Sequence, residues 1–300
     1  MTNTVTFIGL GTMGQPMVRN LARSVPVAVF DVDPNAIDAV ARNEGVTALA
    51  GLVGGAEADV VILMLPNSAI VERVLGDPGD TESFAGRLSP GTLVIDMGSS
   101  APLATQEMAA RLRERHVAMI DAPVSGGPRK AATAELTIMA GGLAEDYERA
   151  LPLLRAMGSS VTHVGPAGSA HALKALNNLL SAIGLVGALE VLTAGTKFGL
   201  DPRIMLDVIN RSTGRNQSTE VKVGPEVLDG RFQVGFSLLL TVKDITTALE
   251  LSASMGLSLE VSEACVQFCR AALADLGGQN PDQSEMARYL AKATGVNLTR

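Results

Sequence analysis

A glycine-rich segment near the start of the chain restricts the possible folds more than any other feature. An apolar run, Val5–Ile8, leads directly into Gly9-Leu10-Gly11-Thr12-Met13-Gly14, and a helix-compatible segment over residues 15–23 follows. Strand, G-x-G-x-x-G and helix in this order are typical of a Rossmann-type domain that binds a dinucleotide. The glycines allow a tight turn, a close approach of backbone to a pyrophosphate, and close packing of the helix. Residues 9–14 are therefore predicted to contact a nucleotide cofactor.

The next strand ends in an acidic residue, which bears on the kind of nucleotide. Residues 27–30 form a second apolar run, and Asp31 follows it directly. In dinucleotide-binding domains a carboxylate at this position accepts hydrogen bonds from the adenosine ribose and repels a 2′-phosphate. Asp31 therefore predicts that the cofactor is NAD rather than NADP.

Further apolar runs continue the alternation of strands and helices. They lie at residues 59–65, 93–96, 117–120 and 136–140, and another short strand is expected near residue 161. A continuous apolar run indicates a strand buried on both faces, as in a parallel sheet. Small and polar residues follow the runs, where doubly wound sheets bind their ligands. We therefore expect a doubly wound, parallel α/β domain over residues 1–164.

A long apolar segment, residues 165–195, connects this domain to the rest of the chain. It is apolar on nearly every side, which predicts a buried interdomain helix. Lys174, Asn178 and Ser181 nevertheless share one side of it, because they follow one another at intervals of four and three residues. From the spacing alone two interpretations stay open. These polar side chains can form part of a site, or Lys174 can extend to water while Asn178 caps a neighbouring loop.

The remainder of the chain is predicted to be helical. Apolar residues recur with helical periodicity at 202–210, 238–255, 258–276 and 284–293, and the polar, glycine-rich stretch 212–235 indicates a loop with a short helix. We expect an all-helical domain over residues 165–300 that serves substrate binding and dimerisation. Small residues on the long helix allow close helix approach and predict a homodimer or homotetramer. They are Gly184, Gly187, Ala188 and Gly195.

Composition argues against several other classes of protein. The net charge of −7, with no run of Lys or Arg, argues against a nucleic-acid partner. The histidines show no metal-ligand spacing, so no metal is expected. Asn177, Asn178 and Glu190 interrupt the long apolar segment, which argues against a membrane span. No secretory signal is visible and Cys265 and Cys269 are expected as buried thiols, so we predict a soluble cytoplasmic protein.

Several spaced motifs, taken together, resemble the β-hydroxyacid dehydrogenase family. They run from FIGLGTMGQPMVRNL through VIDMGSSAP and DAPVSGG to GSAHALKALNN and FSLLLTVKD, so the similarity spans nearly the whole chain. The resemblance implies an NAD-binding fold, a helical second domain and an active site between them. It also implies that Lys174 is the catalytic acid/base and that Asn178 orients the substrate.

The same resemblance implies further contacts. Ser125, Gly126 and Gly127 would bind the substrate carboxylate, a role that a hydroxyl and unobstructed amides suit, although a plain sharp turn is the alternative. Lys243 would line the cleft near nicotinamide and substrate. The residues implied to touch the cofactor are Leu65, Pro66 and Ser99.

Some residues depart from the family pattern. Val18 stands where a small residue is usual, and Ser99 replaces a threonine while keeping the hydroxyl. Glu135 and His171 are also unusual and can alter the choice of substrate. Three cations could meet a second acidic group on a substrate, but a solvated surface charge is the favoured interpretation for each. They are Arg129, Arg215 and Lys222.

The predicted reaction is the NAD-dependent oxidation of the hydroxyl of a short β-hydroxy acid. A base must take the hydroxyl proton, and we expect burial and the charge of Lys243 to lower the pKa of Lys174 from its ordinary value of about 10.4. One alternative is a reductase of a small aldehyde acid of the tartronate or succinic semialdehyde type, or of an imine, although Lys174 argues against an imine. The other is a catalytically silent nucleotide-binding scaffold, against which Lys174 and Asn178 argue together.

Overall fold

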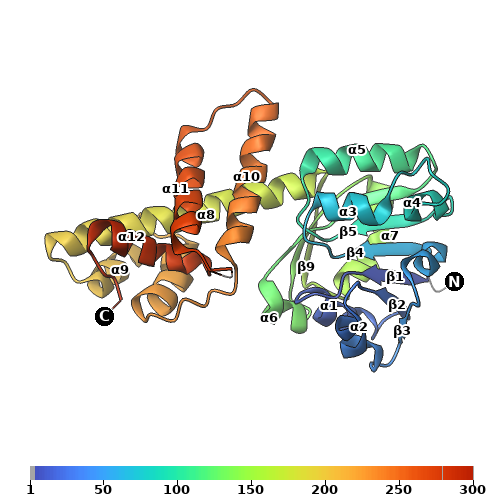
Figure 1. Cartoon of the computed structure of the whole chain (residues 1–300), viewed down its shortest axis with the longest axis horizontal. Coiled ribbons are helices and arrows are strands. Elements are labelled where there is room, and N and C mark those ends of the chain that lie inside the picture. Colours follow the sequence, from blue (N-terminus) through green and yellow to red (C-terminus); the bar gives the residue numbers. More distant parts are fainter. Residues whose placement is uncertain (1–3, 279, 300) are drawn as a thin grey trace. The chain divides into compact units, whose positions relative to one another are not determined.

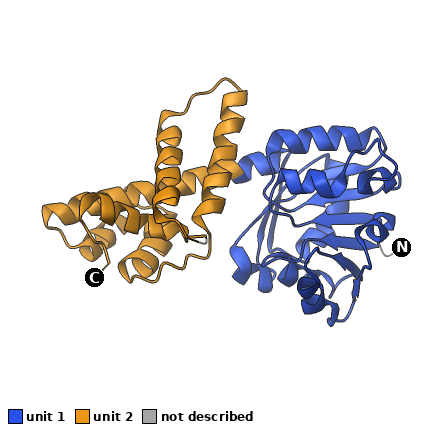
Figure 2. Ribbon diagram, in the orientation of Figure 1, with its two compact units in different colours: residues 1–174 blue, residues 175–300 orange. Residues whose placement is uncertain are grey.

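The computed structural model describes residues 4–278 and 280–299. The chain divides into two compact units, Met1–Lys174 (unit 1) and Ala175–Arg300 (unit 2), which are blue and orange in Figure 2. The division falls inside one long helix, α8 (Ser169–Phe198). The domain boundary predicted after residue 164 precedes this helix, whereas the units divide within it.

Unit 1 is built on a nine-stranded sheet with the order β3-β2-β1-β4-β5-β6-β8-β7, and β9 pairs with β8. From β3 to β6 all neighbouring strands are parallel. The order reverses between β1 and β4, which marks the place where doubly wound sheets bind ligands. The strands are β1 (Val5–Ile8), β2 (Val27–Phe30), β3 (Val46–Ala48), β4 (Val60–Leu63), β5 (Leu93–Asp96), β6 (Ala118–Asp121), β7 (Val124–Ser125), β8 (Thr137–Gly141) and β9 (Ser160–Gly165).

The doubly wound α/β fold predicted from the sequence is confirmed, with one departure at an end of the sheet. There β8 runs antiparallel to β6 and β7, and parallel to β9. Pro123 lies between β6 and β7, where it lacks the N–H that would continue a ladder. Beyond Pro123 the chain continues in the same direction as β7, and it reverses direction between β7 and β8, so a sheet that is parallel over most of its width ends in a mixed edge.

Helices cover both faces of the sheet, because its central strands are apolar on both sides. Phe7 and Ile8 are neighbours in β1 and belong to opposite cores, as the alternation of a strand requires. Figure 1 shows α3, α4 and α5 on one side of the sheet and α1, α2 and α6 on the other. The bounds are α1 (Gly14–Leu21), α2 (Pro34–Ala41), η1 (Leu52–Glu57, a 3-10 helix), α3 (Ser68–Leu75), α4 (Phe84–Arg87), α5 (Pro102–Arg113), α6 (Gly127–Ala132) and α7 (Ala144–Arg155).

Unit 2 is helical, as predicted. One stripe of α8, including Ala175, Leu179, Ala182 and Leu189, forms its core with side chains of the other helices. Cys265 and Cys269 are buried free thiols within that core, as the sequence predicts. The elements after α8 are α9 (Pro202–Asn210), η2 (Thr219–Leu228, a π-helix), α10 (Leu238–Ser254), α11 (Glu260–Leu276), η3 (Gln283–Glu285, a 3-10 helix) and α12 (Met286–Thr294).

The expectation that α8 is buried on nearly every side is wrong. Leu173, Leu176 and Leu180 lie along one side of the helix and are 43%, 41% and 71% exposed. The core of unit 2 takes up the opposite stripe only, so an apolar composition all round does not bring burial all round. By length and composition α8 could also span a membrane, but 44% of its most apolar window is buried and core helices meet the same criterion.

Two of the small residues on α8 lie against side chains of the same chain. A Cβ at Gly195 would lie 2.2 Å from the terminal carbon of Met205, and one at Gly184 would lie 3.3 Å from Oδ1 of Asn216. At Gly187 an added Cβ would meet nothing within 4 Å. The exposed leucines of α8 therefore offer more surface to a second chain than the glycines do.

Candidate active site

The glycine-rich turn after β1 has the geometry that its sequence predicts. Gly9 has a φ of +101°, and a Cβ there would lie 2.3 Å from the carbonyl oxygen of Met64. A Cβ at Gly14 would lie 2.0 Å from the carbonyl oxygen of Gly9, so α1 can begin this close to the turn only with glycine at the position. Gly11 is exposed, and a Cβ there would meet nothing within 4 Å. The turn thus leaves open backbone at Gly11, which fits the approach of a pyrophosphate.

Asp31 lies against the start of this turn. Its Oδ2 accepts a hydrogen bond of 2.5 Å from the amide of Leu10, and its Oδ1 accepts one of 2.9 Å from the amide of Asp33. The carboxylate at the end of β2 is therefore held beside the glycine-rich turn at the end of β1. This is the arrangement expected of a residue that recognises an adenosine ribose.

The loops after β4 and β5 complete this edge of the sheet. A Cβ at Gly98 would lie 2.4 Å from the carbonyl oxygen of Leu65, so the two loops are in close contact. Leu65 and Ser99 are half-buried and Pro66 is exposed. The structure therefore brings the predicted cofactor contacts of unit 1 together at the carboxyl ends of β1, β2, β4 and β5. Lys243, the remaining predicted contact, lies on α10 in unit 2.

Lys174 is directed at the predicted carboxylate-binding turn. Its Nζ donates a hydrogen bond of 2.9 Å to the carbonyl oxygen of Val124, the residue before Ser125. Gly126 and Gly127 have φ values of +134° and +67°, a region that favours glycine, and α6 begins at Gly127. The ammonium group predicted to act on the substrate hydroxyl is therefore one residue from the turn predicted to hold the substrate carboxylate.

A buried polar network holds the first turn of α8 to the sheet. Asp121, at the end of β6, accepts hydrogen bonds of 2.7 Å and 2.8 Å from the amides of Gly168 and His171. The imidazole of His171 is 2.8 Å from the hydroxyl of Thr105 and 3.9 Å from carboxylate oxygens of Asp96 and Asp121. Burial raises the pKa of Asp121, and the charge of His171 and the two amides oppose that rise. His171 thus positions the helix that carries Lys174, a role that its sequence position did not reveal.

Asn178 is held by a buried carboxylate of the same unit. Its Nδ2 donates a hydrogen bond of 2.6 Å to Oδ2 of Asp244, and Asp244 is 3% exposed. The other carboxylate oxygen of Asp244 is 3.0 Å from Nζ of Lys243. Asp244 therefore holds both predicted substrate-binding side chains of unit 2. Sequence reasoning missed it, and the available signal was a carboxylate directly after the predicted Lys243.

The favoured interpretation of Lys222 as a solvated surface charge is wrong. The residue is 8% exposed, and its Nζ donates a hydrogen bond of 3.0 Å to Oγ of Ser181 on α8. Burial lowers the pKa of Lys222, and the charge of Asp282 opposes the change. The interpretation as a solvated surface charge agrees with the structure for the other two cations. Arg129 is exposed, and the exposed guanidinium of Arg215 is 3.6 Å from the carboxylate of Glu220.

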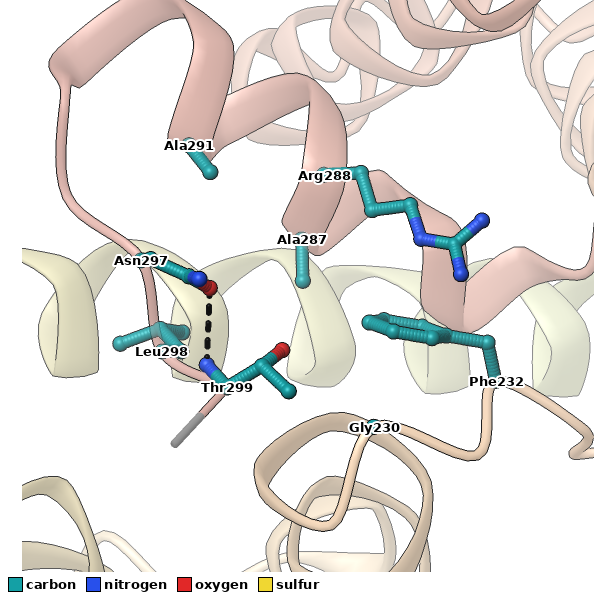
Figure 3. Close-up of a pocket in the computed structure, with 8 residues that line it drawn as sticks. All are labelled: Gly230, Phe232, Ala287, Arg288, Ala291, Asn297, Leu298 and Thr299. Atoms are coloured by element: carbon teal, nitrogen blue, oxygen red, sulfur yellow. Dashed lines mark hydrogen bonds between the residues drawn. The ribbon is translucent and has the colours of Figure 1, made fainter.

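Three remaining features of the described chain add no residues to the predicted site. Glu135 is exposed and accepts a hydrogen bond of 2.8 Å from the hydroxyl of Thr133. Among residues 4–278 and 280–299, no group of His, Cys, Asp and Glu could hold a metal ion. A cavity of about 450 Å³ in unit 2 contains none of the predicted site residues, and Arg288 stacks over Phe232 at its edge (Figure 3). It is lined by Gly230, Phe232, Ala287, Arg288, Ala291, Asn297, Leu298 and Thr299.

The fold and the glycine-rich turn define a protein that binds a dinucleotide cofactor. Residues 4–165 match the family described as the NAD-binding domain of 6-phosphogluconate dehydrogenase. Residues 168–290 match that described as NAD-binding of NADP-dependent 3-hydroxyisobutyrate dehydrogenase. The chain belongs to the β-hydroxyacid dehydrogenase family, as its motifs predicted.

Individual relatives are similar along nearly their whole length. The 2-(hydroxymethyl)glutarate dehydrogenase of Eubacterium barkeri is 33% identical over 296 residues, which cover 98% of this chain and 97% of the relative. The NAD-dependent L-serine dehydrogenase of Pseudomonas aeruginosa is 36% identical over 273 residues, or 89% and 91% of the two chains. The structure of Mycobacterium tuberculosis 3-hydroxyisobutyrate dehydrogenase with L-serine has a TM-score of 0.87 and 31% identity, and covers 97% of this chain and 99% of that one.

Proposed function

We propose that the protein oxidises a short β-hydroxy acid with NAD, using Lys174 as the general acid/base. The observation that carries this proposal is the hydrogen bond of 2.9 Å from Nζ of Lys174 to the carbonyl oxygen of Val124. It puts the ammonium group next to the turn formed by Ser125, Gly126 and Gly127. A β-hydroxy acid has its hydroxyl two carbons from its carboxylate carbon, so a base and an anion-binding turn this close suit both groups of one small molecule.

The turn suits a carboxylate for reasons of local structure. Ser125 supplies a hydroxyl, and the left-handed conformations of Gly126 and Gly127 present backbone amides with no Cβ beside them. An anion held there has its reactive carbon beside Lys174. In the direction of oxidation Lys174 takes the hydroxyl proton, and in the direction of reduction it returns that proton. NAD, when bound, accepts the hydride from the carbinol carbon.

Asn178 lies one turn after Lys174 on α8, and we assign it the orientation of the substrate hydroxyl. Its amide is held by Asp244, and an amide carries no charge that would disturb the ionisation of a neighbouring lysine. We further propose that NAD is preferred over NADP. The carboxylate of Asp31 beside the amide of Leu10 supports this, because it would repel a 2′-phosphate.

The names of the relatives support the substrate class. L-Serine, 3-hydroxyisobutyrate and 2-(hydroxymethyl)glutarate all contain a hydroxymethyl group on the carbon that bears the carboxylate. They differ only in the other substituent on that carbon, which is an amine, a methyl or a carboxyethyl group. We therefore propose a substrate with this shared unit. Reduction of the corresponding aldehyde acid is the reverse reaction and remains the second candidate.

The test is turnover of these three acids, each with NAD and with NADP, by wild type and by Lys174→Ala and Lys174→Arg. We expect turnover with NAD, and a fall of about 10²- to 10⁴-fold in kcat/KM in both variants. Arginine cannot rescue the reaction, because its guanidinium stays protonated. Lys197→Ala removes an exposed lysine from the same helix and should leave the rate unchanged.

A wild-type rate in Lys174→Arg would refute the role of Lys174 as a base. Failure of wild type to oxidise any of the acids would refute the oxidation proposal. If it also reduced no aldehyde acid while still binding NADH, the catalytically silent scaffold would be the better description.

A further inference from the structure

We propose that Lys130 binds the substrate carboxylate and supplies the positive charge that the turn of residues 125–127 itself lacks. The inference rests on the proposed function, because it adds a residue to the carboxylate-binding part of the same site. Lys130, the turn and Lys174 all belong to unit 1.

The side chain of Lys130 lies over the turn. A Cβ at Gly126 would be 2.8 Å from Cβ of Lys130 and 2.7 Å from its Cδ, so the stem of the lysine occupies the space that a larger residue at position 126 would need. This direction follows from the helix, because side chains of α6 tilt toward its N-terminus and Lys130 lies four residues after Gly126. Nζ is two bonds beyond Cδ, so the ammonium group stays close to the turn.

The ammonium group of Lys130 has no protein partner in the described part of the chain. Lys130 is exposed, and within residues 4–278 and 280–299 its ammonium group forms no hydrogen bond and no ion pair within 4.0 Å. Glu135 donates its amide to the carbonyl oxygen of Lys130, but its carboxylate accepts a hydrogen bond from Thr133 instead. The positive charge beside the turn is therefore available to a ligand.

The proposed reaction benefits from a cation at this turn that is not the base. The turn offers a hydroxyl and backbone amides, which are neutral donors, and a carboxylate leaves water at lower cost when a positive charge faces it. Lys174 cannot supply that charge while it accepts the hydroxyl proton, because a lysine must be uncharged to act as a base. Lys243 is 3.0 Å from a carboxylate oxygen of Asp244, so its charge is already balanced. Lys130 can hold the carboxylate while Lys174 exchanges the proton.

Loss of the charge at position 130 provides the test. The variants are Lys130→Met, which keeps an unbranched stem over Gly126, and Lys130→Arg, which keeps the charge. Both should fold, because the side chain is exposed and its ammonium group bonds to nothing else in the described chain. Arg129→Met is the matched control, since it removes one positive charge from an exposed residue of the same helix.

For 3-hydroxyisobutyrate with NAD, we expect Lys130→Met to raise KM by about 5- to 30-fold, as for a charge-assisted hydrogen bond that stays partly exposed to water. The change in kcat should be less than about threefold, because the carboxylate is held equally in the ground state and the transition state. Lys130→Arg and Arg129→Met should stay within about threefold of wild type. An unchanged KM in Lys130→Met, or an equal rise in Arg129→Met, would overturn the inference while leaving the proposed reaction intact.

Binding of isobutyrate and of its neutral amide, isobutyramide, separates the inference from the proposed function. Neither compound has a hydroxyl to oxidise, and the two differ in the charge of one group. Calorimetry should show that wild type binds isobutyrate more tightly than isobutyramide and that Lys130→Met removes most of this difference. That result supports the inference even when no acid is oxidised, and only the proposed reaction then fails. If wild type shows no preference for isobutyrate, or Lys130→Met retains the preference, the inference fails whatever the turnover.

Discussion

Asp244 is the residue whose removal tests the arrangement of the unit 2 side chains most directly. One of its oxygens accepts from Nδ2 of Asn178 at 2.6 Å, and the other is 3.0 Å from Nζ of Lys243. Asp244→Ala removes the acceptor for both groups at once. Asp244→Asn keeps the shape and one acceptor, but turns an N–H toward either Asn178 or Lys243, which are both donors.

The expected loss of stability depends on how deeply each partner of Asp244 is buried. Removing one member of a buried ion pair costs about 3–5 kcal/mol when the other stays dry. The Lys243 side chain is 26% exposed, so water can solvate part of its charge. We therefore expect Asp244→Ala to lower the free energy of unfolding by about 1–3 kcal/mol. Loss of the orientation of Asn178 should lower kcat by about 10²-fold.

Urea unfolding followed by circular dichroism gives the first quantity, and steady-state kinetics gives the second. If Asp244 acts by positioning Asn178, kcat should fall with little change in KM, and Asp244→Asn should lie between wild type and Asp244→Ala. Asp207→Ala, which breaks an exposed pair with Arg211, should cost less than about 1 kcal/mol and leave kcat unchanged. A loss of stability in Asp244→Ala with unchanged kcat would refute the positioning role.

Two further predictions concern Lys222 and the exposed side of α8. Burial lowers the pKa of Lys222 against the attraction of Asp282, so the folded protein holds fewer protons than the unfolded one just below the ordinary value of 10.5. The contribution of Lys222 to the free energy of unfolding should therefore rise with pH toward 10.5. Lys222→Met should be more stable than wild type at neutral pH and lose that advantage above pH 10.5, and parallel pH profiles would contradict this. We also propose that the protein self-associates through the stripe that includes Leu180. Sedimentation equilibrium should then show an oligomer for wild type and dissociation for Leu180→Glu, whereas a monomeric wild type would contradict it.

The glycine-rich turn shows what can be predicted from sequence and why. Its conformation depends on interactions within a few residues: Gly9 needs a positive φ, and Gly14 needs the space that a Cβ would fill. Buried strands are equally local signals, because a short, uninterrupted apolar run such as β4 is typical of a strand that is covered on both faces. The meeting of the predicted cofactor contacts at one edge of the sheet then follows from topology, since parallel strands bring their carboxyl ends together.

The pairs that hold the unit 2 side chains could not be predicted in the same way. Asn178 and Asp244 are 66 residues apart, and Ser181 and Lys222 are 41 apart. No periodicity relates such positions, because each pair depends on how two helices pack. Which side of α8 is buried could not be predicted for the same reason. Leu179 faces the core and Leu180 does not, although the composition is alike on both sides.

The helix α8 carries three polar side chains that have separate supports. Lys174 is held by the carbonyl oxygen of Val124, Asn178 by Asp244, and Ser181 bonds to Lys222. The three lie on one continuous helix, so their axial spacing is set by a rise of about 1.5 Å per residue and by main-chain hydrogen bonds. Their supports therefore need only to orient each side chain, since the backbone of α8 already determines the spacing of the three residues along the helix. A substitution that bends α8 between residues 174 and 181, such as a proline, should then reduce activity more than the loss of any one support.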